Sequence, residues 1–284
     1  MATGKALDGK PYAGNPHVRF DEGEVAPATT PRRGSLLYKT IIGKDKNDLG
    51  RLAADDAAAR ICAAIAANGE ARVVFASAAS QFEFIEALLT HKEIDWSKVC
   101  GFHLDEYVGL PADHPASFRR FLRERLLAKL PCPVKGFTFV GGDAPDTAAE
   151  CARLESALRE KPIDLACIGI GENGHIAFND PPADFETKAA YAVVNLDETC
   201  RRQQVGEGWF PDLAAVPTQA FSMTVPQILA AKAIVVIVPD ARKAEAVKRT
   251  VEDAVSPTVP ATALKTHADC VLYLDPPAAA LLSK

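Results

Sequence analysis

The fold is indicated most clearly by residues 163–181, which have the sequence IDLACIGIGENGHIAFNDP. The apolar run Ile163–Ile168 is typical of a buried strand, and the glycines after it allow a tight turn and a close ligand approach. This turn leads to His175, and Asp180 follows five residues later. Because histidine is the side chain best suited to move protons near neutral pH, the stretch predicts a strand that ends at an active site.

Short apolar runs alternate with helical patterns along most of the remaining chain. This alternation predicts an α/β fold, a Rossmann-like three-layer sandwich with a mostly parallel central sheet and helices on both faces. Ligands bind beyond the carboxyl ends of the strands in such sheets, so the turn before His175 would lie at the binding edge. The predicted strands are Arg72–Ala76, Val99–Leu104, Phe137–Val140, Ile163–Ile168, Tyr191–Leu196, Ile234–Val238 and Cys270–Leu274. The predicted helices are Asp55–Asn68, Phe82–Leu89, Phe118–Leu130, Thr147–Glu160, Ala241–Glu252 and a final alanine-rich segment.

Length, composition and charge limit the class of protein. The chain has 284 residues, and its first forty are rich in Gly, Pro and Thr without a clear period, so we predict an N-terminal extension at 1–40 and a single domain at 41–284. The net charge of −5 without a basic stripe disfavours nucleic acid, and no apolar run approaches the roughly 20 residues of a membrane span. Seven scattered cysteines without a C-x-x-C pair or signal peptide favour a cytoplasmic protein and disfavour a metal site.

Polar residues follow two other predicted strands. Ser77 and Ser80 come after the first strand, where free amides at a helix N-terminus would favour an anion such as phosphate. Because this loop lacks glycine, a simple N-cap at Ser80 is the stronger interpretation of the segment by itself. Asp105 and Glu106 follow the second strand, and they could include a general base, or they could form an N-cap or a solvated turn.

The turn at 169–174 also satisfies the pattern G-x-G-x-x-G, but a loop-like segment follows it where a dinucleotide site requires a helix. A lone histidine in a loop is more often a hydrogen-bonding residue than a catalyst. Asp180 and Asp105 at the same sheet edge favour a catalytic role for His175.

Further cationic residues could contact an anion. Arg201 and Arg202 could clamp a phosphate, and the glycines on both sides of Glu207 could be the hinges of a lid, although a solvated helix end explains this segment equally well. Lys243 follows the strand 234–238 at the same edge, and it is either an anion ligand or a surface lysine.

Two segments resemble the signatures of the glucosamine-6-phosphate deaminase/isomerase family: DEYVGLPADHPASF at 105–118 and GIGENGHIAFNDP at 169–181. Weaker similarity extends from about Leu49 to the C-terminus. The related 6-phosphogluconolactonases have Asp-Glu-Arg where this chain has Asp-Glu-Tyr, at 105–107. The resemblance implies a hydrolase/aldose–ketose isomerase that converts glucosamine 6-phosphate and water to fructose 6-phosphate and ammonia without a cofactor.

The resemblance also implies roles for individual residues. His175 would open the sugar ring, and Asp105 would transfer a proton between C2 and C1. Asn173 and Asp180 would complete the catalytic group, although the family often has Asp and Glu at these two positions. The phosphate contacts would be Ser77, Ser80 and Lys243, but the loop at 77–81 lacks the glycines of the family's phosphate loop.

Because the predicted phosphate-binding loop departs from the family pattern, two alternatives remain open. The substrate could be a different sugar phosphate, or Arg201 or Arg202 could bind the phosphate group. A sugar lactone hydrolase in which His175 activates water and a non-catalytic sugar-phosphate sensor are alternative functions. The expected partner is a small-molecule sugar phosphate rather than nucleic acid or a membrane, and a homo-oligomer is compatible with the sequence.

Overall fold

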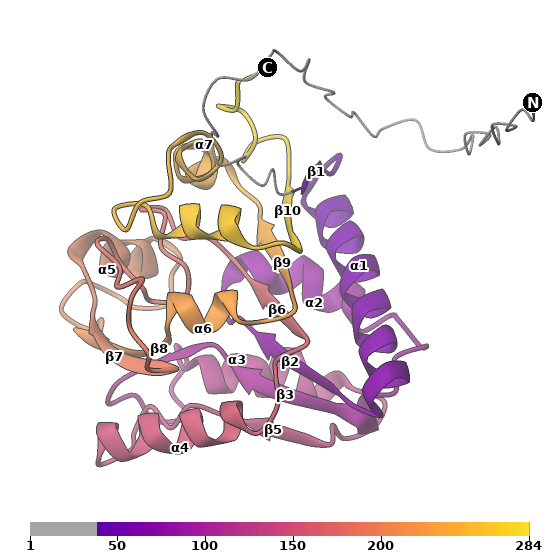
Figure 1. Ribbon diagram of the computed structural model, residues 1–284. Coiled ribbons are helices and arrows are strands. Elements are labelled where there is room, and N and C mark those ends of the chain that lie inside the picture. Colours follow the sequence, from indigo (N-terminus) through magenta and orange to yellow (C-terminus); the bar gives the residue numbers. More distant parts are fainter. Residues whose placement is uncertain (1–38, 284) are drawn as a thin grey trace, which may run out of the picture. The chain divides into compact units, whose positions relative to one another are not determined.

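The computed structural model describes residues 39–283, and its centre is a parallel sheet of seven strands (Figure 1). The strand order is β1–β10–β9–β6–β2–β3–β5, and every neighbouring pair is parallel. The strands are β1 (Lys39–Ile42), β2 (Ala71–Phe75), β3 (Val99–His103), β5 (Gly136–Thr138), β6 (Leu165–Ile168), β9 (Ala233–Val238) and β10 (Cys270–Leu274).

Helices cover both faces of this sheet, as the predicted three-layer fold requires (Figure 1). One face packs against α1 (Lys46–Asn68), α2 (Phe82–Leu88) and α3 (Phe118–Arg125). The other face packs against α4 (Thr147–Arg159), α6 (Val225–Leu229) and α7 (Ala244–Glu252). The fold class predicted from the sequence is therefore confirmed.

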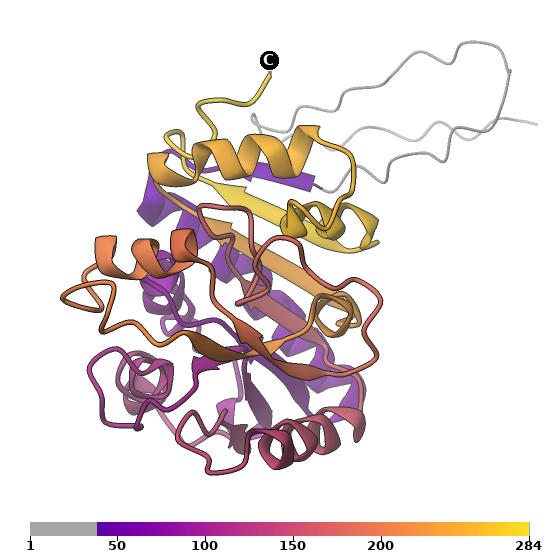
Figure 2. The same cartoon turned by 90° about the vertical axis from the view of Figure 1, so that its left-hand side faces the viewer.

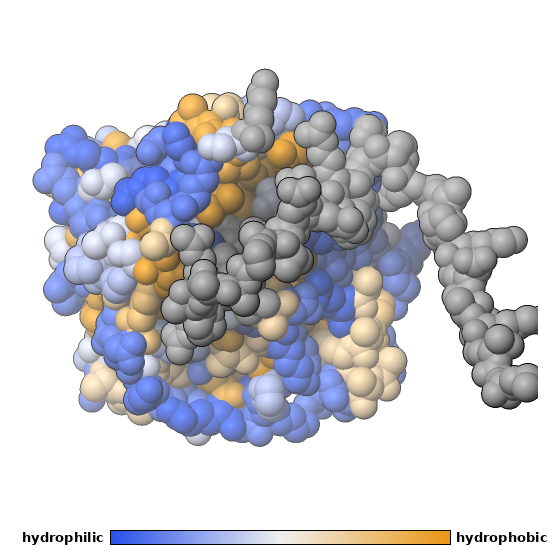
Figure 3. Space-filling model, turned by 45° about the horizontal axis from the view of Figure 1, so that its top comes forward, coloured by the Kyte–Doolittle hydropathy of each residue, from blue (hydrophilic) through white to orange (hydrophobic). Residues whose placement is uncertain are grey.

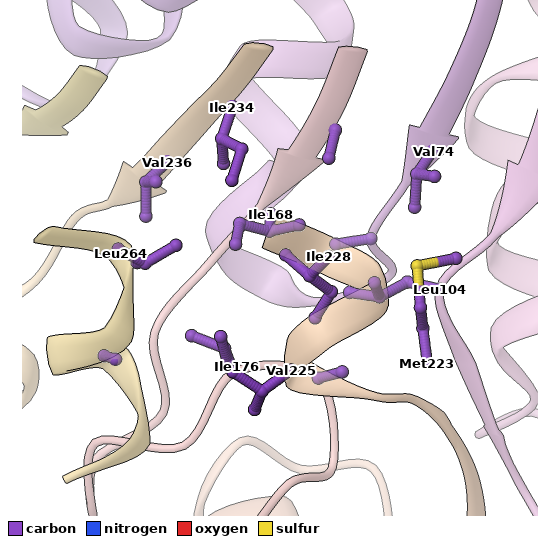
Figure 4. Packing of buried hydrophobic residues seen from close by; sticks show 14 of the residues in the cluster. Val74, Leu104, Ile168, Ile176, Met223, Val225, Ile228, Ile234, Val236 and Leu264 are labelled. Atoms are coloured by element: carbon purple, nitrogen blue, oxygen red, sulfur yellow. The ribbon is translucent and has the colours of Figure 1, made fainter. Parts of the chain in front are cut away.

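The continuous apolar runs form central strands because both of their faces are buried. In β9, Ile234, Val236 and Val238 point into one hydrophobic cluster, and Val235 and Ile237 point into the other. Figure 4 shows Ile234 and Val236 among the side chains of the first cluster. Two packed faces on each strand fix the register of the sheet and thus the position of its carboxyl edge.

Helix α1 shows how local sequence sets the ends of an element. The Asp45 carboxylate accepts hydrogen bonds from the backbone amides of Asn47 and Asp48, which caps the first turn. Gly69 ends the helix at φ = 77°, a left-handed conformation that glycine adopts without a steric penalty. The predicted end at Asn68 is confirmed, whereas the helix begins nine residues earlier than the predicted Asp55.

A second, antiparallel sheet was not predicted. It contains β4 (Asp105–Tyr107), β8 (Gln219–Met223) and β7 (Tyr191–Asn195), in the order β4–β8–β7, and it lies in front of the central sheet in Figure 2. The interpretation of residues 105 and 106 as a solvated turn is wrong, because both are buried in β4 and pair with β8.

Helix α5 (Glu198–Gly206) packs on the second sheet through a separate cluster of buried side chains. Tyr107 lies at the centre of this cluster, with ring centroids of Phe118, Phe178 and Phe210 between 5.1 and 5.3 Å away. The Tyr107 hydroxyl donates a hydrogen bond to Gln204 Oε1 at 2.8 Å. This bond turns the side of α5 that carries Gln204 toward the second sheet.

Three other predictions need correction or lie outside the described residues. The predicted C-terminal helix is a series of turns at 276–281, in which the Ala280 and Leu282 amides donate to the carbonyl oxygens of Pro277 and Ala279, three residues back, rather than in the repeated four-residue pattern of an α-helix. Ser80 is not the N-cap of α2; it lies within a short 3₁₀ turn, Ala79–Gln81, before the helix. The predicted extension at 1–40 lies outside the described residues except for Lys39 and Thr40, which belong to β1.

The surface of residues 39–283 offers few large hydrophobic side chains. Ile42, Val255 and Leu281 are the exposed ones, and hydrophobic residues lie between hydrophilic ones on the face shown in Figure 3. In this part of the chain, every helix is too short or too polar to cross a bilayer.

Candidate active site

A cavity opens at the carboxyl edge of the central sheet, where the sequence predicted ligand binding. The segments that follow β2, β3, β6 and β9 all contribute to it, and α5 supplies a further wall. The lining residues are Ala76, Ser77, Ala78, Ser80, Leu104, Asp105, Phe118, Gly169, Ile170, Gly171, His175, Ala177, Phe178, Gln203, Gln204, Glu207 and Lys243. Five predicted site residues therefore meet here: Ser77, Ser80, Asp105, His175 and Lys243.

The two adjacent acids of β4, Asp105 and Glu106, point to opposite faces of the strand, because side chains alternate along a strand. Asp105 lines the cavity and is 6% exposed. Burial and the neighbouring charge of Glu106 raise the pKa of Asp105 well above its ordinary value, and no hydrogen bond from the described part of the chain opposes this shift. A carboxylate without a hydrogen-bond donor at a cavity wall is well suited to accept a proton from a ligand.

Glu106 has a different, structural role. Its carboxylate accepts hydrogen bonds from the Ser117 hydroxyl at 2.8 Å and from the backbone amides of Tyr107, Phe118 and Arg119 at 2.9–3.2 Å. Burial raises the pKa of Glu106, and these donors partly offset that shift. Glu106 thus holds the start of α3 against β4, and this leaves Asp105 as the acid that faces the cavity.

The glycines of the turn after β6 make room for the imidazole of His175. A Cβ atom at Gly171 would lie 2.2 Å from ring atoms of His175, so only glycine fits beneath the ring. Gly174 adopts φ = 86°, which an L side chain rarely tolerates. The two glycines therefore place His175, which is 7% exposed, against the floor of the cavity.

Asp180 lies beside the ring of His175 on the side away from the cavity. Its Oδ1 is 3.0 Å from His175 Nδ1, although an N–H on Nδ1 does not point straight at this oxygen. Burial would raise the pKa of Asp180, but His175, Asn173 and the Asp197 amide together lower it. An ionised Asp180 favours the tautomer with the proton on Nδ1, which leaves Nε2 free to exchange protons with a ligand.

Asn173 links the loop after β6, residues 169–181, to the start of α5. Its amide nitrogen donates to Asp180 Oδ1 at 3.0 Å and to Asp197 Oδ2 at 2.9 Å, and its carbonyl oxygen accepts from the His175 amide at 3.0 Å. Asp197 is also the N-cap of α5 and accepts from the Cys200 amide. An amide can donate to two carboxylates at once, whereas a carboxylate at this position could donate to neither.

The loop after β2 presents two serine side chains to the cavity. Burial gives His103 a pKa of about 3, so its ring is neutral. The Val140 amide donates to His103 Nδ1 at 3.4 Å, so the ring proton is on Nε2, 3.5 Å from Ser77 Oγ. Ser77 Oγ accepts a hydrogen bond from Nε2–H, so its own hydroxyl proton remains available to a ligand. The Ser80 hydroxyl accepts from Gln81 Nε2 at 3.1 Å.

Lys243 is buried at the start of the segment after β9, and it is not the surface lysine that the sequence left as an alternative. Its Nζ lies 3.8 Å from Glu207 Oε1 and 4.0 Å from Glu172 Oε1. Burial lowers the pKa of Lys243, and the two glutamates partly offset this. Among the described residues that line the cavity, it is the only lysine or arginine.

The two arginines of α5 do not reach the cavity. Arg201 donates to the backbone oxygens of Leu213 and Val216, so its guanidinium holds the loop after α5. Arg202 forms an exposed ion pair with Glu198. The hypothesis that Arg201 or Arg202 anchors a phosphate is therefore not supported by their positions, since neither residue lines the cavity, Arg201 Nη2 is bound to the loop after α5, and Arg202 is paired with Glu198.

Several residues near the site were not singled out by the sequence. Asn179 donates to the backbone oxygens of Ile176 and Met223 and to Ser222 Oγ, which fastens the loop after β6 to β8. Gln203 Oε1 accepts from the Glu172 amide at 3.0 Å. The polar sequence of 198–209 indicated that this segment could contribute to a site. It did not indicate which residues of α5 face the cavity, because that depends on contacts with segments distant in sequence.

One group of side chains within residues 39–283 has the composition of a metal site. Single ligand atoms of His175, Asp180 and Cys200 lie within 4.8 Å of one another. Burial, and then the charges of Asp180 and Asp197, raise the pKa of the Cys200 thiol. Because a metal binds the thiolate, this raised pKa opposes metal binding at the cluster.

Comparisons with known proteins agree on one family. The model of the family described as glucosamine-6-phosphate isomerases/6-phosphogluconolactonase matches residues 44–273. A glucosamine-6-phosphate deaminase from Listeria innocua is 37% identical over 215 residues, which covers 76% of this chain and 89% of that relative. A glucosamine-6-phosphate deaminase from an Exiguobacterium species is 40% identical over 186 residues, 66% of this chain and 71% of that relative.

Solved structures show the same architecture. The structure of a monomeric glucosamine-6-phosphate deaminase superposes with a TM-score of 0.79 at 29% identity, and covers 86% of this chain and 99% of its own. The 6-phosphogluconolactonase from Trypanosoma brucei superposes with a TM-score of 0.69 at 18% identity, and covers 88% of this chain and 100% of its own. At that lower identity the similarity concerns the fold alone.

Proposed function

The chain belongs to the family of glucosamine-6-phosphate isomerases and 6-phosphogluconolactonases, and from this we propose that it converts glucosamine 6-phosphate and water to fructose 6-phosphate and ammonia. The observation that carries the proposal is the Asp105 carboxylate, which is buried at the cavity wall, has a raised pKa and receives no hydrogen bond from residues 39–283. An isomerisation that moves hydrogen from C2 to C1 of a sugar requires such a base.

The proposed reaction begins with ring opening at His175. With its Nδ1 beside Asp180, the ring would take the proton of the anomeric hydroxyl at Nε2 and return it to the ring oxygen. The amino-aldehyde that results carries an acidic hydrogen at C2. Gly171 supports this step because it allows the imidazole to lie directly on the turn.

Asp105 would then remove the C2 proton and return a proton to C1 through an enolamine intermediate. Water adds to C2 and ammonia leaves, so that the atoms of the substrate and one water become fructose 6-phosphate and ammonia. The raised pKa makes the ionised carboxylate a stronger base than an exposed aspartate. A positioned base of this kind contributes about 10²–10⁴-fold to a proton-transfer step.

The phosphate group would bind at the opposite wall, beside Ser77, Ser80 and Lys243. The Ser77 hydroxyl has its proton available for this contact because His103 supplies the hydrogen bond that it accepts. The buried Lys243 supplies the cationic charge. The phosphate group would thus be recognised by one cation and by serine hydroxyl groups. Side chains would make these contacts because the loop at 77–81 lacks the glycines that let a backbone approach a phosphate closely.

A coupled assay tests the proposal. Purified protein is incubated with glucosamine 6-phosphate, and ammonia and fructose 6-phosphate are measured in parallel, beside galactosamine 6-phosphate and 6-phosphogluconolactone. The proposal predicts equal amounts of both products from glucosamine 6-phosphate, and their loss in Asp105→Asn. Hydrolysis of the lactone without ammonia release would support the lactonase alternative, and binding of the phosphosugar without turnover would support the sensor alternative.

A further inference from the structure

A carboxylate lies inside the cavity at the place where the proposed function requires an anion from the substrate. Glu207 follows the last turn of α5 and lines the cavity, with a side chain that is 5% exposed. Its Oε1 is 3.8 Å from Lys243 Nζ. The buried ammonium group of Lys243 therefore already has a carboxylate of the protein beside it.

Glu207 is held in place by two hydrogen bonds. Gln203 Nε2 donates to Oε1 at 2.8 Å, and the indole Nε1 of Trp209 donates to Oε2 at 3.1 Å. These contacts aim the carboxylate at Lys243 rather than at solvent. The position of Glu207 is therefore defined by three partners: Gln203 in α5, Trp209 just after it, and Lys243 in the segment after β9.

A phosphate dianion beside Lys243 would be in conflict with this carboxylate. Unit charges of the same sign about 4 Å apart repel even at the dielectric constant of water, and more strongly in a partly buried site. Lys243 is the only lysine or arginine among the described lining residues, so no second cation of the lining could neutralise both anions.

Glu172 is the other carboxylate near Lys243, and its situation differs. Its Oε1 is 4.0 Å from Lys243 Nζ and 3.9 Å from Arg242 Nη1, and its side chain is 29% exposed. Glu172 therefore has a second cation and access to water. Glu207 is buried, and Lys243 is the cation within 4 Å of it in the described part of the chain.

We propose that Glu207 occupies the anion position beside Lys243 in the free protein, and that the phosphate of the substrate displaces it. Glu207 would therefore determine the affinity for phosphorylated ligands. This inference rests on the proposed function for the identity of the anion. The flanking glycines support the displacement, since Gly208 has φ = 82° and neither Gly206 nor Gly208 would bring a Cβ within 4 Å of another group.

Calorimetric titration with inorganic phosphate tests the proposal directly. Glu207→Gln keeps an acceptor oxygen for Trp209 and removes the charge, so we expect phosphate to bind at least about fivefold more tightly than in the wild type. The matched control is Glu198→Gln, which removes a charge from the exposed side of the same helix. This control should leave phosphate affinity within about twofold.

Trp209 provides a second measurement that needs no change at Glu207. Displacement of the carboxylate breaks its hydrogen bond to the indole, so phosphate should change the tryptophan fluorescence of the wild type. The other tryptophan, Trp96, is buried in the core at 1% exposure and does not line the cavity. The fluorescence change should therefore disappear in Trp209→Phe.

The outcomes separate this inference from the proposed function. Equal or weaker phosphate binding by Glu207→Gln, or binding to the wild type without a fluorescence change, would overturn the displacement. Tighter phosphate binding by Glu207→Gln would support the displacement. If the wild type at the same time failed to release ammonia from glucosamine 6-phosphate, the proposed reaction would be wrong although the displacement held. Absence of phosphate binding in the wild type and in Glu207→Gln would overturn the inference.

Discussion

Replacement of Asn173 by aspartate tests how the loop after β6, which carries His175, is joined to α5. The Asn173 amide donates hydrogen bonds to the Asp180 and Asp197 carboxylates, at 3.0 and 2.9 Å. The introduced carboxylate could donate to neither and would add a third negative charge. Hydrogen bonds to charged groups contribute about 1.5–3 kcal/mol each, and the two contacts are partly buried. At the lower end of this range, we expect the free energy of unfolding to fall by about 3 kcal/mol at pH 7.

Urea denaturation of four proteins measures this effect: wild type, Asn173→Asp, Asp197→Asn and the double variant. Asparagine is as good an N-cap as aspartate, so Asp197→Asn should preserve the start of α5. In the double variant the amide introduced at position 197 can donate to the carboxylate introduced at position 173. We therefore expect the double variant to be about 1.5 kcal/mol more stable than the sum of the single effects predicts.

The dependence on pH supplies a further check. In Asn173→Asp, the charges of Asp180 and Asp197 would raise the pKa of the introduced carboxyl group in the folded state, so the folded protein would hold a proton that the unfolded chain has released. The free energy of unfolding then falls as pH rises from the pKa of the unfolded carboxyl group to the higher pKa of the folded one. The loss of stability in Asn173→Asp relative to the wild type should therefore be smaller at about pH 4 than at pH 7. A loss below about 0.5 kcal/mol at pH 7, or additive single effects, would refute this account of Asn173.

Three further predictions concern the cavity. Gly171→Ala should lower kcat about 100-fold in steady-state kinetics, because the new Cβ would displace the His175 ring; a loss below tenfold would contradict this. Glu106→Ala should lower the free energy of unfolding by about 3 kcal/mol in urea, because four donors lose their acceptor. Asp105→Asn should raise the free energy of unfolding measured in urea at pH 8, because burial and the charge of Glu106 raise the pKa of the Asp105 carboxyl in the folded state. Since the raised pKa means that the ionised form destabilises the folded state, this gain should vanish near pH 3, where folded and unfolded Asp105 are both protonated.

The parts of the fold that the sequence predicted correctly are those set by local patterns. The apolar run of β9 indicates a strand buried on both faces without knowledge of its neighbours. Gly169–Gly174, His175 and Asp180 lie in one loop, so their proximity follows from chain connectivity. Strand β1 was missed because Lys39–Ile42 contains only two apolar residues, and its assignment depends on pairing with β10, more than 200 residues away.

The parts that were missed depend on contacts between distant segments. Three residues, Asp105–Tyr107, are too few to show alternation, and they form a strand because β8 pairs with them. The orientation of the α5 side chains has a similar origin. Gln204 and Glu207 face the cavity, whereas Arg201 turns to the backbone of a later loop, and the cluster around Tyr107 sets this rotation. Composition gave no means to separate these faces.

The central claim is that Asp105 removes the C2 proton of glucosamine 6-phosphate, exchanges it with the solvent and then delivers a proton to C1. Nuclear magnetic resonance of the products formed in D₂O tests it most directly. The account predicts that fructose 6-phosphate formed by the wild type carries solvent deuterium at C1 and that ammonia appears in equal amount, whereas Asp105→Asn forms neither at a measurable rate. Turnover by Asp105→Asn at the wild-type rate, with deuterium at C1, would contradict the claim.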